Sequence, residues 1–126
     1  LQIIHGYGGG QFRIAGQTYD GAQFVLPRLT LGWQVTSLED ITVAAITDRL
    51  ATGKNSGILE GQDGQMTELV ILGVGARADS HLPQLARALK EKSIRLEVMT
   101  TAAACRTWNV LLTEGRSAAV GLLPVD

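Results

Sequence analysis

The sequence lacks several features that would assign it to common protein classes. Its single cysteine, Cys105, cannot form an internal disulfide, which favours a reducing compartment. The net charge is −1, so there is no excess of basic residues for nucleic acid or anionic lipid. No apolar run approaches the roughly 20 residues of a membrane helix. We therefore expect neither a nucleic-acid partner nor membrane insertion.

Metal ligands are equally scarce. The two histidines, His5 and His81, lie far apart and show no ligand spacing, so we expect neither a metal nor a cofactor. What is present is the composition of an ordinary globular protein, with 45% hydrophobic and 18% charged residues over 126 residues. A chain of this length buries about two-thirds of its unfolded surface and needs no disulfide or metal to fold.

The first part of the chain predicts short antiparallel strands. Three consecutive glycines place Tyr7–Gly10 in a loop. Phe12–Ile14 and Thr18–Tyr19 flank Ala15–Gln17, a spacing typical of a tight hairpin. A strand is next expected over Gln23–Leu26.

Pro27 interrupts the strand predicted over Gln23–Leu26. Because proline has no N–H to donate to a neighbouring strand, we expect that strand to lie at a sheet edge. Thr30–Val35 predicts the next short strand, with Trp33 as its buried anchor.

The first helix is predicted to begin at Thr42, which can cap it. Ile41 and Ile46 fit the apolar pair that often brackets such a cap, and Gly53 would end the helix. A start at Ser37 is the alternative. The following stretch, 53–66, is glycine-rich and polar, so we expect a surface loop there.

The second half predicts alternating strands and helices. Leu69–Leu72 is wholly apolar, as in a central strand covered on both faces. After a turn over 73–76, Asp79 or Ser80 would cap a helix that tolerates Pro83 in its first turn. Ile94–Val98 is then expected to pair in parallel with the earlier strand.

A third helix follows directly, over Thr101–Glu114, with Thr100 or Thr101 as its cap. Its apolar stripe has three-to-four spacing. The members of that stripe are Cys105, Trp108, Leu111 and Leu112. Gly115 would end the helix, and Ala118–Leu123 is the last predicted strand. These elements predict one α/β domain over residues 1–126, with a mixed sheet, helices on both faces and an N-terminal antiparallel hairpin region.

Several motifs resemble those of a known family, the small Mth-type domain proteins, over nearly the whole chain. The matching residues are Tyr7-Gly8, Phe12, Tyr19 to Gly21, Leu26-Pro27, Trp33, Leu72 to Gly75, Glu97 to Met99, Thr101, Ala103 to Thr107, Asn109, Leu111-Leu112, Glu114 and Arg116. The sequence departs from the family at Val74, Thr100, Trp108 and the long loop over 53–66.

This resemblance implies a three-layer domain around a mixed sheet, without established enzymatic activity. The family includes a mitochondrial complex I assembly factor and an adipogenesis-associated protein, so the resemblance implies protein partners and a role in assembly or maturation. It also implies a cytoplasmic protein in bacteria. A mitochondrial location would require a targeting segment upstream of Leu1, where the sequence given begins.

The residues suggest one candidate ligand site, for a small anion. Two turns follow two parallel strands, and ligands of open α/β sheets bind beyond the carboxyl ends of the strands. Backbone N–H groups and an arginine there would suit a carboxylate or phosphate, which makes a ligand-binding protein or enzyme the alternative function. The residues of this predicted anion crevice are Gly73, Gly75, Glu97, Thr100, Thr101, Arg106 and Asn109. The alternative is structural, with Thr101 only a cap and Arg106 paired to Glu97 or Glu114.

Two further functions, dinucleotide binding and catalysis by a cysteine, have weaker support from the sequence. The turn over 73–78 fits G-x-G-x-x-G/A, with Glu97 placed where a dinucleotide fold holds a ribose. However, Ser80 and Pro83 put the next helix start later than that motif requires, so a plain turn is favoured. Cys105 lies near a helix start beside Arg106, as a nucleophile would. It also falls on the apolar stripe, which favours a buried, inert thiol.

Overall fold

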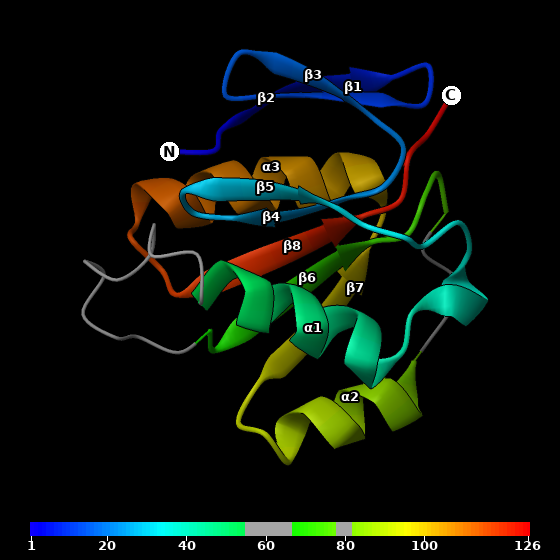
Figure 1. Cartoon of the computed structure of the whole chain (residues 1–126), viewed down its shortest axis with the longest axis vertical. Helices are drawn as coiled ribbons and strands as arrows, with labels where there is room; N and C mark the ends of the chain where they lie inside the picture. Colours follow the sequence, from blue (N-terminus) through cyan, green and yellow to red (C-terminus); the bar gives the residue numbers. More distant parts are fainter. Residues whose placement is uncertain (55–66, 78–81) are drawn as a thin grey trace.

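The computed structural model describes residues 1–54, 67–77 and 82–126, which form two β-sheets and flanking helices (Figure 1). The strands are β1 Ile4–Gly8, β2 Gln11–Ile14, β3 Gln17–Asp20, β4 Gln23–Leu26, β5 Leu29–Gly32, β6 Leu69–Gly73, β7 Arg95–Met99 and β8 Ala118–Leu122. The helices are η1 Leu38–Asp40 (a 3-10 turn), α1 Val43–Lys54, α2 Pro83–Lys90 and α3 Thr101–Thr113.

The central sheet has five strands in the order β5-β4-β8-β6-β7. β6 pairs in parallel with β7 and with β8, whereas β4 is antiparallel to β5 and β8. The sheet is therefore mixed, as predicted. Every residue of β6 is buried, which agrees with its all-apolar sequence and confirms the predicted central strand.

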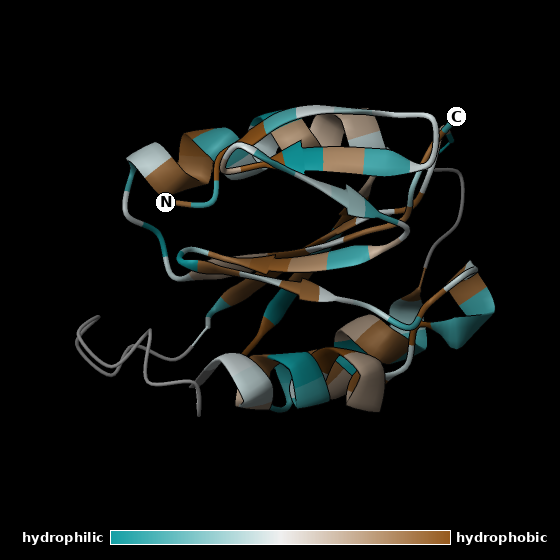
Figure 2. Cartoon of the chain, turned by 45° about the horizontal axis from the view of Figure 1, so that its top comes forward, coloured by the Kyte–Doolittle hydropathy of each residue, from teal (hydrophilic) through white to brown (hydrophobic). Residues whose placement is uncertain are grey.

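Helices cover both faces of this sheet, which confirms the predicted α/β class (Figure 1). α1 and α2 lie on one face, over a core anchored by Phe24, Trp33, Ile46 and Leu72. α3 lies on the other face. There its buried stripe shares a second core with Phe12 of the small β1-β2-β3 sheet. In Figure 2 the apolar residues gather on the central strands between these layers.

The predicted helix caps are largely confirmed. Thr42 Oγ1 accepts a hydrogen bond from the N–H of Ala45 at 3.1 Å, so α1 begins where predicted. Ser37 caps the separate turn η1 instead of extending α1. For α2 the predicted cap was wrong, because the residue at its N-cap is Leu82, whereas Pro83 lies in the first turn as predicted. Asp79 and Ser80, the caps expected there, lie outside the described residues.

Two strand predictions were also wrong. Tyr7 and Gly8 were expected in a loop but are the last two residues of strand β1, where pairing with β2 outweighs the local glycine signal. β4 lies inside the central sheet and not at its edge, since Pro27 comes after its last residue and removes no donor from it. The expected strand over Thr30–Val35 is confirmed only in part, because β5 ends at Gly32.

Trp33 lies beyond the end of β5, and its side chain is buried as expected. Within the described residues, no helix is long and apolar enough to cross a lipid bilayer.

Candidate functional site

The fold brings together the two turns of the predicted anion crevice, at the carboxyl ends of β6 and β7. The N–H of Gly75 donates to Thr101 Oγ1 at 2.9 Å, and the N–H of Thr101 donates to the carbonyl of Gly75 at 2.9 Å. Gly73 lies so close to α3 that an added Cβ would be 2.9 Å from both Ala104 Cβ and Thr101 Cα. Glycine is therefore required at position 73 for packing of the helix on the strand.

The hydroxyl of Thr101 also joins β8 to this corner. It donates to the carbonyl of Leu123 at 2.7 Å, and the N–H of Leu123 donates to the carbonyl of Gly73 at 2.8 Å. Thr101 is fully buried. The ends of the three parallel strands are thus held together by groups of the chain itself, so the hydroxyl already has both a donor and an acceptor as partners.

Thr100, and not Thr101, is the cap of α3. Its Oγ1 accepts from the N–H of Ala103 at 3.1 Å, and its carbonyl accepts from the N–H of Ala104 at 2.8 Å. Since Thr101 is bonded to Gly75 and Ala103 to Thr100, two of the N–H groups that a helix start leaves free have partners inside the protein. An anion needs such groups unpaired, so the local geometry favours the structural interpretation of this corner.

The two charged residues of the predicted crevice do not pair with each other. Glu97 lies on β7 and its carboxylate is 3.5 Å from Arg95. Glu114, the other predicted partner of Arg106, lies 4.0 Å from Arg116. Arg106 is exposed on α3, and no ion pair within residues 1–54, 67–77 and 82–126 includes it. Both pairings proposed for Arg106 from the sequence are therefore wrong, and anion binding by its free guanidinium stays a prediction.

Asn109 lies away from this corner. It is eight residues past Thr101, about 12 Å along the helix. Its Oδ1 accepts from the N–H of Ile4 at 2.9 Å, and its Nδ2 donates to the carbonyl of Ile4 at 2.8 Å. The Asn109 side chain thus bonds the backbone N–H and C=O of Ile4 as a neighbouring strand would, and it attaches the small sheet to α3.

Cys105 is buried at 4% exposure beside Trp108. Burial raises the pKa of its thiol to about 12, and the nearby charge of Arg106 lowers the pKa by less. The thiol is therefore protonated at neutral pH, which disfavours a nucleophilic role. No three His, Cys, Asp or Glu side chains of the described segments lie close enough to share a metal ion.

The glycine motif does not have the geometry of a dinucleotide site. In such a site the turn leads directly into a helix whose N–H groups face the phosphates. Here the N–H of Gly75 is bonded to Thr101, and α2 begins only at Pro83. Gly75 has a φ of +100°, so the turn itself requires glycine. A structural turn explains the motif.

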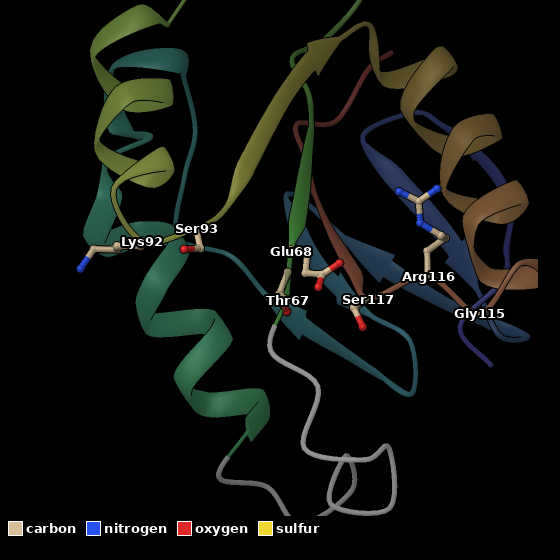
Figure 3. A pocket seen from close by; sticks show the side chains of 7 residues that line it. All are labelled: Thr67, Glu68, Lys92, Ser93, Gly115, Arg116 and Ser117. Atoms are coloured by element: carbon tan, nitrogen blue, oxygen red, sulfur yellow. The ribbon is translucent and has the colours of Figure 1, made fainter.

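A polar depression of about 490 Å³, which no sequence pattern predicted, lies at the opposite ends of the same strands (Figure 3). It is lined by Thr67, Glu68, Lys92, Ser93, Gly115, Arg116 and Ser117. Figure 3 shows that Lys92 points its amino group away from the other lining side chains. The charged groups therefore do not converge on one ligand position.

Fold and site together define a small mixed α/β protein whose strand-end corner is closed by its own hydrogen bonds. The chain belongs to the family described as "Protein of unknown function (DUF498/DUF598)", whose model matches residues 4–123. A solved structure from Bordetella pertussis, titled a Mth938-like domain, superposes with a TM-score of 0.77 at 25% identity, covering 98% of this chain and 85% of that one. The resemblance to Mth-type proteins is thereby confirmed.

Similar proteins occur in both animals and bacteria. A Danio rerio protein named NADH dehydrogenase (ubiquinone) 1 alpha subcomplex assembly factor 3 is 35% identical over 122 residues, which are 97% of this chain and 64% of that protein. An uncharacterised Rhodobacter capsulatus protein is 34% identical over 123 residues, 97% of this chain and 84% of the relative. The chain thus spans less than two-thirds of the animal protein.

Proposed function

We propose that this protein is a non-enzymatic assembly or maturation factor that acts by binding other proteins, with the respiratory NADH dehydrogenase as its target complex. The observation that carries the proposal is the match of 97% of the chain to an animal assembly factor at 35% identity. We further propose that it is a single domain and acts in the cytoplasm when encoded by a bacterium.

The chemistry of the strand-end corner supports a binding role over catalysis. The hydroxyl of Thr101 and the N–H of Gly75 are already bonded to each other, and the Cys105 thiol stays protonated. An enzyme of this fold class would use such groups at the strand ends to hold or attack a substrate.

Exposed apolar side chains offer contact points for a protein partner. Tyr7 on β1 is 43% exposed and Val110 on α3 is 55% exposed. β1 and α3 contact each other through Asn109, so both side chains belong to neighbouring elements. Tyrosine is among the residues that contribute most of the binding energy at protein interfaces, and an exposed apolar side chain beside it adds area that a partner can bury.

The test is deletion of the gene in the organism that encodes it, followed by native gels of membrane complexes and NADH oxidation by membranes. We expect subassemblies of the NADH dehydrogenase to accumulate and activity to fall. Re-expression of the wild type should restore both, whereas Val110→Asp should restore less than the matched exposed change Thr113→Asp. Normal assembly in the deletion strain would refute the proposal.

A second candidate function is binding of a small anion, favoured by the exposed and unpaired guanidinium of Arg106 within the described chain. Thermal denaturation of wild type and Arg106→Ala with phosphate and carboxylates separates the two. A ligand at 100 times its dissociation constant adds about 2.7 kcal/mol of stability. A shift seen only in the wild type supports the anion site, and no shift in either leaves protein binding as the function.

A further inference from the structure

The outer edge of β7 is an unpaired strand edge. β7 ends the order of the central sheet, and among the described strands only β6 pairs with it. In Figure 3, β7 runs from Ser93 toward the start of α3, with α1 and α2 on one side and α3 on the other. An edge of this kind presents backbone N–H and C=O groups that another strand can bind.

The backbone direction of each β7 residue follows from its bonds to neighbouring segments. The N–H of Arg95 donates to Glu68 at 2.8 Å, and the carbonyl of Met99 accepts from Val74 at 2.9 Å. The alternate residues of a strand point to opposite sides, so the backbone groups of Leu96 and Val98 point away from β6. These outward groups must be matched by any added strand.

The charges on β7 are self-complementary. Arg95 and Glu97 lie two residues apart on one face, and their side chains are 76% and 39% exposed. In an antiparallel pair of two β7 strands centred on Leu96, Arg95 of each copy lies opposite Glu97 of the other. If the pair were centred on Glu97 instead, the two Glu97 side chains would lie opposite each other. If it were centred on Arg95, the two Arg95 side chains would do so.

The backbone and the charges select the same register. Centring on Leu96 makes the two Leu96 residues a hydrogen-bonded pair, because their N–H and C=O groups both point outward. Arg95 and Glu97 of the second copy then form a non-hydrogen-bonded pair, in which side chains approach most closely. A register shifted by one residue would leave the outward groups without partners.

From this agreement we infer that β7 binds the β7 strand of a second copy of this chain, antiparallel and centred on Leu96. The two five-stranded sheets then form one continuous sheet with a twofold axis at its centre. On the other face the two Leu96 side chains, each partly buried against the core under α1 and α2, lie opposite each other. This inference goes beyond the proposed function and does not depend on it.

Charge exchange tests both the surface and the register. Arg95→Glu and Glu97→Arg each oppose like charges at two places and should weaken self-association at least about tenfold, measured by analytical ultracentrifugation at low salt. An equimolar mixture of these two variants should form a heterodimer, since each acidic strand faces a basic one. The double variant Arg95→Glu/Glu97→Arg again places opposite charges across the pair, so it should dimerise like the wild type. Arg28→Glu, an exposed change in the β4–β5 turn, is the matched control and should not alter association.

Thermal denaturation confirms that each variant is folded before association is measured. A wild type that stays monomeric up to roughly 1 mM would overturn the inference. So would single variants that dimerise as well as the wild type. A mixture that remains monomeric, while the wild type dimerises, would overturn the register.

Discussion

Thr101 and Gly75 exchange two hydrogen bonds, each 2.9 Å long, across the carboxyl ends of β6 and β7. The hydroxyl of Thr101 is also bonded to the carbonyl of Leu123, so one buried side chain joins three segments. The polar groups that the sequence predicted for a ligand crevice are therefore used here to hold the strand ends together.

Replacement of Thr101 by valine should therefore be costly. Thr101→Val keeps the side-chain shape but leaves the N–H of Gly75 and the carbonyl of Leu123 without a partner. We expect the free energy of unfolding to fall by about 2 to 4 kcal/mol, measured by urea denaturation. Thr101→Ser keeps the hydroxyl and should lose clearly less. A loss in Thr101→Ser as large as that in Thr101→Val would contradict this, because it would show that packing of the methyl group contributes as much as the hydrogen bonds.

Gly121 on β8 is predicted to tolerate no side chain, because an added Cβ would be 2.6 Å from two ring carbons of Trp33. The indole cannot easily move, since its Nε1 donates to the carbonyl of Ala45 at 2.9 Å. We expect Gly121→Ala to cost about 1 to 3 kcal/mol. The smaller ring of Trp33→Phe should reduce that cost in a double-mutant cycle. Additive effects would contradict a direct clash.

Ser93 offers a stabilising substitution. Its φ is +63°, a left-handed conformation at the end of α2, where its N–H bonds to Lys90 and that of Ile94 bonds to Leu89. Gly115 occupies the matching position after α3, with a φ of +68°. Ser93→Gly should raise the free energy of unfolding by about 1 kcal/mol in chemical denaturation. An unchanged or lower stability would show that the Ser93 side chain contributes more than the backbone strain costs.

The Cys105 thiol should make stability fall at alkaline pH. Its pKa is raised from 9.0 to about 12 by burial. Between these values the unfolded chain has lost the proton and the folded protein keeps it, so rising pH favours unfolding. We expect the loss between pH 9 and 12 to be smaller in Cys105→Ala than in the wild type, in denaturation curves at each pH. Rapid reaction of the native thiol with a disulfide reagent at neutral pH would contradict this burial.

Local sequence patterns predicted much of the fold. The apolar run of β6, the Thr42 cap of α1 and the stripe on α3 all depend on neighbours within a few residues. For the candidate site, the sequence correctly placed Gly75 and Thr101 together, because the carboxyl ends of adjacent parallel strands share one sheet edge.

The remaining features depend on contacts between residues far apart in the chain, which no local pattern contains. Asn109 is 105 residues from Ile4, and their two hydrogen bonds help hold strand β1, whose last two residues were predicted to be in a loop. The inner position of β4 is set by its pairing with β8, near the other end of the chain. The sequence by itself determined most of the elements, the caps of α1 and α3, and the family. Only the tertiary structure decided which backbone groups pair, and so which polar groups remain available for a ligand or a partner.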